Sequence, residues 1–278
     1  MAFRKIFLVL ILMHGFVSAQ IRGVVKDSLT GTPIPYVSIW VENETIGTTS
    51  EEDGTFSLNT TPNKVLIFSA LGYEKTQKNS LQYNQVLLVP KSTVLEEMVV
   101  VPRKGTKTRE IGETENRLSE AFDSAPSIDL KYFPYSAAYK KTPYLKKVVL
   151  YTDSRIPSAT LKLHFYSVDA QGNPGAELLT DEYRVSVKQG VGKSSFTITE
   201  LGLTMPENGM YVGFEKLMIE DNRSNGGRFY PLVLYNRLPK DFVFVYTGGK
   251  WQKNVLRSDP SSQQVKAYEP AINLILTN

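Results

Sequence analysis

Very few residues in this chain could do acid–base or metal chemistry. After His14 the only histidine is His164, and there are no cysteines. A catalytic zinc site usually needs three protein ligands that include His or Cys, so the sequence excludes a zinc peptidase. A Ser-His-Asp arrangement would have to use His164, which lies between Leu163 and Phe165. We expect His164 to be a solvated histidine on the solvent-exposed face of a strand. No catalytic, metal-binding or cofactor-binding residue is predicted.

Two glycine-rich or acidic segments imitate ligand-binding loops. Gly190 to Ser194 ends like a phosphate-binding loop, but Val187 stands where the first glycine is required, and strand-like runs flank the segment. We interpret it as a hairpin turn. Glu220 to Gly226 has the composition of a calcium loop, yet Arg223 occupies a ligand position and no Glu closes it. A polar loop is favoured; a calcium site around Asp221 would need oxygen ligands from a neighbouring loop.

Carboxylates and aromatic residues leave two functional alternatives open. Glycoside hydrolysis needs two acids that face each other across a cleft. The groups Glu51 to Asp53 and Glu177 to Glu182 each lie near one connection, so neither is a credible pair by sequence. The 15 Tyr, 13 Phe and 2 Trp supply material for a sugar-stacking or protein-docking patch, although most should be core. Trp251 is expected nearest a loop tip, with structural packing favoured for it.

The N-terminus has the three parts of a secretory signal peptide. Arg4 and Lys5 precede the apolar stretch Ile6 to Met13, and Val17 to Ala19 supply small residues for cleavage. The apolar stretch is shorter than the ~20 residues of a membrane-spanning helix. We therefore expect residues 1–19 to be removed and the mature chain to be exported to the periplasm, the outer-membrane surface or the medium, with no transmembrane span.

Charge gives no indication of an anionic partner. Residues 20–278 carry 30 Lys and Arg against 28 Asp and Glu. Nucleic-acid binding usually requires a basic stripe, and the basic groups here are short, so no nucleic-acid partner is expected.

Period-two patterns show which elements must position these residues. Phe56 and Leu58 alternate with polar residues, as do Leu161, Leu163 and Phe165. A polar stretch, residues 102–114, separates two such regions and should be a linker or a solvated strand. We predict an all-β chain of two tandem β-sandwiches, with domains at 20–101 and 115–278. The second region has about eight expected strands, the number of a jelly roll.

A family resemblance supports the first domain. The string IRGVVKDSLTGTPIPYVSIWVENETIGTTSEEDGTFSL, followed by LIFSALGYEK, resembles the carboxypeptidase-like regulatory domain. That resemblance implies a transthyretin-like β-sandwich, which is an accessory to the zinc domain in metallocarboxypeptidases and precedes the plug in TonB-dependent receptors. KLHFYSVDAQGNPGAELL and MYVGFEKL resemble a jelly-roll partner in envelope proteins. Both resemblances imply a fold rather than an activity.

The string VLEEMVVV resembles the segment that follows this domain in TonB-dependent receptors, near the strand that engages TonB. The candidate partner strand is therefore Glu97, Met98, Val99, Val100 and Val101. No plug motif follows, so the last strand of the first sandwich is favoured and a TonB-type partner is not expected. The sequence thus predicts an exported, non-catalytic binding or assembly module of the cell envelope that recognises a protein or glycan. The alternative is a glycan hydrolase with carboxylates that only the fold brings together.

Overall fold

The structure is a computed structural model that describes residues 19–80, 84–91, 105–112, 118–121, 126–238, 240–254 and 267–278. The signal peptide up to Ser18 and the candidate strand Glu97 to Val101 lie outside these residues. Within them the chain is all-β, with short 3-10 helices η1 (Ala137–Lys141), η2 (Thr199–Leu201) and η3 (Glu220–Asn222). No helix in the described ranges is long and apolar enough to span a membrane.

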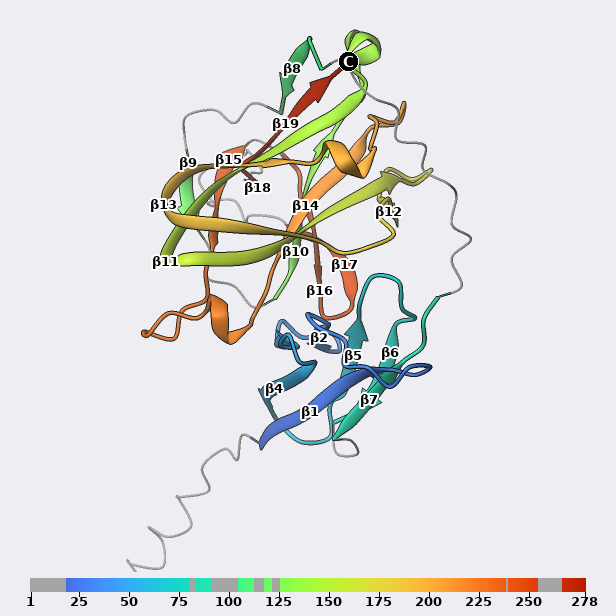
Figure 1. The fold of residues 1–278 in the computed structure, drawn as a ribbon, viewed down its shortest axis with the longest axis vertical. Coiled ribbons are helices and arrows are strands. Elements are labelled where there is room, and N and C mark those ends of the chain that lie inside the picture. Colours follow the sequence, from blue (N-terminus) through green and yellow to red (C-terminus); the bar gives the residue numbers. More distant parts are fainter. Residues whose placement is uncertain are drawn as a thin grey trace, which may run out of the picture.

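The first half of the chain folds into two small sheets that pack face to face (Figure 1). One sheet has the order β4-β1-β7 and the other β3-β2-β5-β6. Their strands are β1 (Ala19–Asp27), β2 (Ser38–Val41), β3 (Gly47–Thr49), β4 (Thr55–Thr60), β5 (Val65–Ser69), β6 (Thr76–Asn79) and β7 (Gln85–Leu88). Alternate residues of β4 point inward, as predicted, and Phe56 meets Phe68 of the opposite sheet edge to face at 5.6 Å. This contact places the core between the two sheets.

The second half is one large, strongly bent sheet of twelve described strands. They are β8 (Thr108–Ile111), β9 (Leu118–Ala121), β10 (Ile128–Phe133), β11 (Tyr144–Val168), β12 (Pro174–Glu177), β13 (Tyr183–Thr197), β14 (Met210–Lys216), β15 (Leu232–Leu238), β16 (Val243–Thr247), β17 (Lys250–Asn254), β18 (Ala267–Pro270) and β19 (Ile272–Thr277). Strand β8 lies inside the stretch expected to be a linker or a solvated strand, and it pairs with β19, as the strand alternative predicts. The sheet therefore begins before residue 115.

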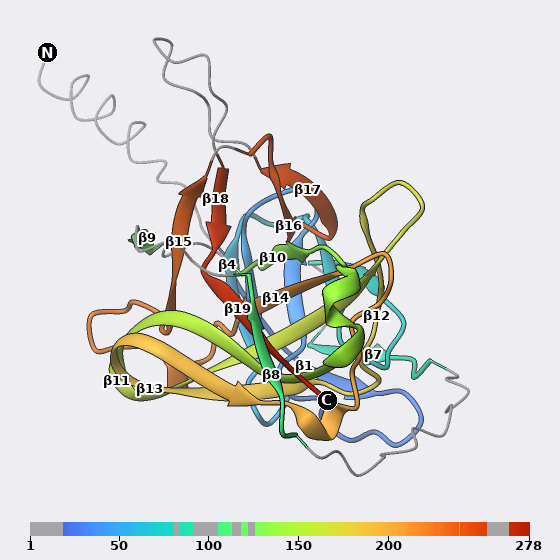
Figure 2. The same ribbon diagram turned by 90° about the horizontal axis from the view of Figure 1, so that it is seen from above.

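A two-stranded ribbon, β11 with β13, runs along this half and curves strongly (Figure 2). The first part of β11 also pairs with β19 and the last part with β14. The pairing register shifts between Ser154 and Ser158, where Ile156 and Pro157 interrupt the ladder. Because the ribbon bends there, residues before and after the bend in the same strand can enclose a single core. The β11 residues in that core include Leu145, Val148, Leu150, Leu161, Leu163 and Phe165.

The bend also corrects one sequence interpretation. Gly190 to Ser194 do not form a hairpin turn, because they lie within β13 and pair with Leu150 to Ser154 of β11. Gly190 and Gly192 have positive φ values of 128° and 155°, so this part of β13 departs from regular strand geometry. The glycines therefore lie within a strand rather than in a connection between strands.

Candidate functional site

A cavity of about 190 Å³ lies between the two halves of the chain, and several charged side chains line it. Its wall includes Ser38, Trp40 and Leu71 from the first half. The second half contributes a cluster of ionisable side chains: Lys162, His164, Glu177, Glu182 and Glu215. We refer to these five residues as the ionic cluster. Its position at the meeting of the two halves makes it the candidate site.

Strand geometry places the members of the ionic cluster together. Lys162 and His164 are two residues apart on β11, so their side chains share the face opposite Leu163. Lys162 pairs in register with Glu215 of β14, which brings those side chains to the same face. On the other side, Glu177 of the neighbouring strand β12 pairs with Tyr166 of β11. The face of β11 that points away from the apolar core therefore has carboxylates on both sides.

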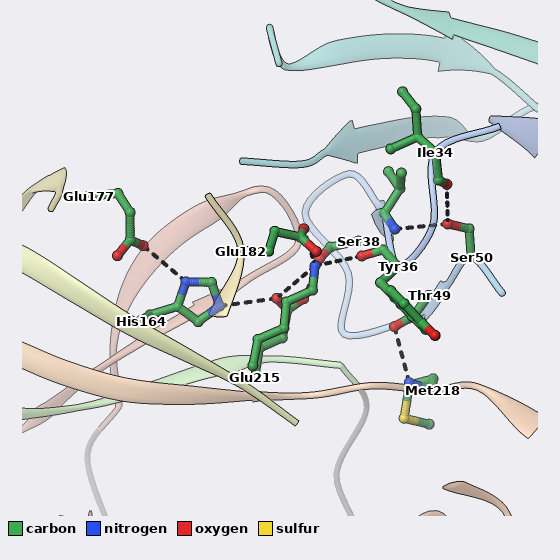
Figure 3. Close-up of polar contacts among 12 residues, drawn as sticks. Ile34, Tyr36, Ser38, Thr49, Ser50, His164, Glu177, Glu182, Glu215 and Met218 are labelled. Carbon is green, nitrogen blue, oxygen red and sulfur yellow. Dashed lines mark hydrogen bonds and ion pairs between the residues drawn. The ribbon is translucent and has the colours of Figure 1, made fainter. Parts of the chain in front are cut away.

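Hydrogen bonds and ion pairs link the cluster into a chain (Figure 3). His164 Nδ1 is 2.9 Å from Glu177 Oε2, and His164 Nε2 is 3.2 Å from Glu215 Oε2. Lys162 Nζ is 2.5 Å from Glu182 Oε1 and 3.9 Å from Glu215 Oε2. The backbone N–H of Phe165 donates to Glu177 Oε1 at 2.7 Å. Every member of the cluster therefore has an opposite charge beside it.

The cluster sets the protonation state of its histidine. Burial alone would lower the pKa of His164, but the hydrogen bonds and negative charges of Glu177 and Glu215 outweigh it and raise that pKa to about 9. At neutral pH the ring is therefore charged, and both ring nitrogens donate. Burial would raise the pKa of Glu215, yet Lys162, His164 and Ser38 together hold it below its ordinary value. Glu215 is thus an ionised carboxylate rather than a proton donor.

The same cluster joins the two halves of the chain. Ser38 Oγ on β2 donates a hydrogen bond to Glu215 Oε1, and Lys162 Nζ donates to the carbonyl oxygen of Tyr36 at 2.6 Å. Further hydrogen bonds across the same interface are Trp40 Nε1 to Pro126 O, Met218 N to Thr49 Oγ1, Glu220 N to Glu51, Lys75 Nζ to Tyr246 Oη, and Lys250 Nζ to Asn43 Oδ1. Buried and polar contacts thus fix one half on the other.

Aromatic rings form the remaining wall of the cavity. Trp251 contacts Tyr166 and Tyr246 edge to face, at 5.1 Å in both cases, and Trp40 contacts Tyr246 at 5.2 Å. Tyr183 also lines the cavity. Trp251 is at the start of β17, next to the Gly248-Gly249 turn, as the sequence suggested, and it packs against neighbours. Both tryptophans of the chain lie at this one cavity.

Sequence reasoning misjudged this site. His164 is not a solvated residue, because its side chain is only 13% exposed and is held by two carboxylates. The first half of the chain covers a face of β11 that alternation alone assigns to water. The carboxylates Glu177 and Glu182 do converge, together with Glu215, once β12, β13 and β14 are assembled. A usable signal was present: Lys162 and His164 lie on one strand face, and Glu215 lies in the mostly apolar string MYVGFEKLMI, where Lys216 is the one other charged residue.

The cluster offers little to a metal ion. A metal ion bound by His164 would have to displace a ring proton that Glu177 or Glu215 accepts. Among the described residues no group of three or more His, Cys, Asp or Glu side chains has an arrangement that could hold a metal ion. The loop Glu220 to Gly226 begins with η3, whose Asn222 is fully buried and bonded to the backbone of Thr160 and Leu217. That amide has a structural role.

Known proteins match mainly the first half. Over 81 residues the chain is 30% identical to the TonB-dependent receptor SusC of Bacteroides thetaiotaomicron, in a match that covers 29% of this chain and 8% of the receptor. The chain therefore spans less than a tenth of the length of that relative. A solved structure of infectious bursal disease virus, Gx strain, aligns with 92% of this chain and 64% of that one, at 10% identity and a TM-score of 0.26. The family model described as CarboxypepD_reg-like domain matches residues 21–101, and this part of the chain is a CarboxypepD_reg-like domain.

Proposed function

We propose that this protein is an exported, non-catalytic binding or assembly module of the cell envelope, in which the CarboxypepD_reg-like domain and the second β-domain act as one body. Export is supported by the signal-peptide pattern of residues 1–19. An envelope setting is supported by the similarity of residues 21–101 to part of a TonB-dependent receptor. The partner is a protein or a glycan of the envelope.

The observation that carries the proposal is the mutual pairing of charges in the ionic cluster. His164 donates from both ring nitrogens, and the carboxylates that accept are themselves held by Lys162, Ser38 and the N–H of Phe165. A general acid or base works best when its pKa lies near the operating pH. The pKa of His164 is raised to about 9 and that of Glu215 is held below its ordinary value, so neither group is poised for proton transfer near neutral pH. The arrangement of the cluster suits a rigid binding surface.

One observation favours a second candidate, a glycan hydrolase. The fold brings Glu177 and Glu215 to opposite nitrogens of His164 beside a cavity, so carboxylates from separate strands do meet. Glycoside hydrolysis, however, requires one carboxyl group whose pKa is raised so that it can protonate the leaving group. The pKa of Glu215 is shifted in the opposite direction. The binding function is therefore the better supported of the two.

The deciding experiment combines capture with an activity assay. Tagged mature protein is crosslinked in envelope fractions of the producing cell, with excess untagged protein as competitor. We expect capture of a defined envelope component that the competitor abolishes. Purified protein is also incubated with envelope polysaccharides. Hydrolysis that scales with protein and disappears in Glu177→Gln and Glu215→Gln would replace the binding function by the hydrolase, and capture that the competitor leaves unchanged would also count against the proposal.

A further inference from the structure

The cavity between the two halves has a chemical character that narrows what could bind there. Three of its charged residues are acidic, namely Glu177, Glu182 and Glu215, and three are basic, namely Lys91, Lys162 and His164. With His164 protonated, the wall carries no net charge. An anionic or cationic ligand would therefore bring an uncompensated charge into a partly buried site, which is costly.

A hydroxyl-rich ligand meets no such penalty. Each hydroxyl group is both a donor and an acceptor. A carboxylate has about four lone-pair sites, and the cations of the cluster use only part of that capacity, so hydroxyl groups can add hydrogen bonds without displacing Lys162 or His164. The alternation of carboxylate and cation along the cluster presents acceptors and donors side by side.

The aromatic wall gives the apolar side of the same site. Trp251 and Tyr166 are half-buried, whereas Trp40 and Tyr246 behind them are buried. Aromatic rings with a polar rim suit a ligand that has an apolar C–H face and a polar edge. The volume of about 190 Å³ is smaller than the ~300–1,000 Å³ of pockets for larger ligands. It allows one ring of a chain rather than an oligosaccharide.

We propose that this cavity is a subsite for one neutral sugar residue of a glycan, with Trp251 as the stacking ring, Tyr166 at right angles to it as a second apolar side, and the ionic cluster as the hydrogen-bonding wall. This proposal rests on the proposed binding function and selects the glycan among its partners. Because residues of both halves line the cavity, the site exists only when the CarboxypepD_reg-like domain lies on the second domain.

The position of the tryptophans allows a direct test. The chain has two tryptophans, Trp40 and Trp251, and both line the cavity, so intrinsic tryptophan fluorescence reports on this site. The purified mature chain is titrated with methyl β-D-glucopyranoside, methyl α-D-mannopyranoside, methyl β-D-galactopyranoside and N-acetylglucosamine. We expect a saturable change with at least one of them, with a Kd of about 1–10 mM for so small a ligand. Glucosamine and glucuronate are the charged counterparts and should bind at least about tenfold more weakly.

Variants test whether the fluorescence change arises from binding in the cavity. Trp251→Ala should weaken binding at least about tenfold, with Trp40 still reporting, and Trp251→Phe should retain part of it. Glu182→Gln keeps the size of this side chain at the edge of the cavity but removes its charge. It should change the affinity if the cluster binds hydroxyl groups. Tyr132→Ala removes an exposed aromatic ring that does not line the cavity and should leave the affinity unchanged. Thermal unfolding of each variant verifies that it is folded.

The outcomes separate this proposal from the broader one. Absence of a saturable response to every neutral sugar, or tighter binding of glucosamine or glucuronate, overturns the sugar subsite. Equal affinities of folded Trp251→Ala and the parent chain do the same. If the crosslinking capture still succeeds with such a result, the binding function stands with another ligand; if both fail, the function itself is rejected.

Discussion

Lys162 in the second half of the chain donates a hydrogen bond to the backbone carbonyl oxygen of Tyr36 in the CarboxypepD_reg-like domain, at 2.6 Å. The same ammonium group is ion-paired with Glu182 and Glu215, and its side chain is only 3% exposed. A single cation thus serves two carboxylates on its own domain and one carbonyl on the other. The stability of each domain should therefore depend on contact with its neighbour.

Replacement of Lys162 by Met should be strongly destabilising. Met fills much of the same volume but leaves Glu215 buried without its lysine partner and leaves the Tyr36 carbonyl without a donor. Removal of one partner of a buried ion pair typically costs about 3–5 kcal/mol. Urea unfolding of Lys162→Met measures this loss. Lys188→Met, at an exposed position on β13, is the matched control and should stay within about 0.5 kcal/mol of the parent. Equal losses for the two variants would contradict the role of Lys162.

Stability should fall on the alkaline side because of His164. Its pKa rises from an ordinary value of 6.5 to about 9 in the folded chain, so the folded state binds the proton more tightly. The contribution is complete below about pH 6.5 and is lost as the pH rises toward 9. The difference between the two pKa values corresponds to roughly 3 kcal/mol. The free energy of unfolding, measured from pH 6 to pH 10, should decline over this window. In His164→Gln the decline should be much smaller, and an unchanged decline would assign it to other groups.

Glu215 should act in the opposite direction. Its pKa is lowered in the folded chain, so its contribution is present above the ordinary pKa of a glutamate and is lost as the pH falls. The parent chain should therefore lose stability in acid faster than Glu215→Gln does, even though the variant is less stable at neutral pH. Acid unfolding followed by circular dichroism gives both midpoints. A parallel acid response of parent and variant would mean that other carboxylates dominate.

Alternation along β11 predicted the environment of one face of this strand correctly and that of the other face wrongly. Leu161, Leu163 and Phe165 are fully buried in the core, as the period-two pattern indicated. The pattern cannot tell whether the opposite face meets water or another domain, because a covered polar face and a solvated one have the same residue types. Lys162 bonds to Tyr36 of the first half, 126 positions away, and His164 lies beside it on the same face. Contacts between domains are not encoded in local periodicity.

The family resemblance predicted the first domain in more detail than local patterns could. The Asp53-Gly54 turn, with Gly54 at φ 76°, and the inward-facing Phe56 are as expected. For the second half of the chain, the sequence patterns indicated strands but not how the strands pair. Alternation in this stretch indicated only Leu161 to Phe165, whereas the structure has one bent strand of 25 residues, Tyr144–Val168. The jelly-roll assignment of this half stays a prediction.

The export prediction can be tested without reference to the fold. Signal peptidase should cleave after Ala19, so the mature chain should begin at Gln20. N-terminal sequencing of protein recovered from the envelope or the medium measures this directly. Retention of Met1, or protein confined to the cytoplasm, would contradict export. A Leu10→Arg substitution, which places a charge in the apolar stretch, should block processing and serves as the control.

The turn between β16 and β17 offers a way to disturb the interface between the domains without altering a charge. Gly248 has a φ of 59°, and a β-carbon added there would lie 2.8 Å from the carbonyl oxygen of Glu44 in the first domain and 3.0 Å from its backbone nitrogen. The backbone N–H of Asn43 donates to the Gly248 carbonyl oxygen at 3.1 Å. Gly248→Ala should therefore strain the turn and also push the domains apart.

Gly172 is the matched control, because it has a φ of 80° and no atom within 4 Å of an added β-carbon. Both alanine variants share the cost of a positive φ, about 1–2 kcal/mol, so the difference between them isolates the clash with the first domain. We expect Gly248→Ala to lose a further ~1–3 kcal/mol in urea unfolding, the usual cost of overpacking. Its tryptophan fluorescence should also change, because Trp251 is three residues away and lines the interdomain cavity. If the two variants were equally stable and their fluorescence matched, the close approach of the β16–β17 turn to the first domain would not exist in solution.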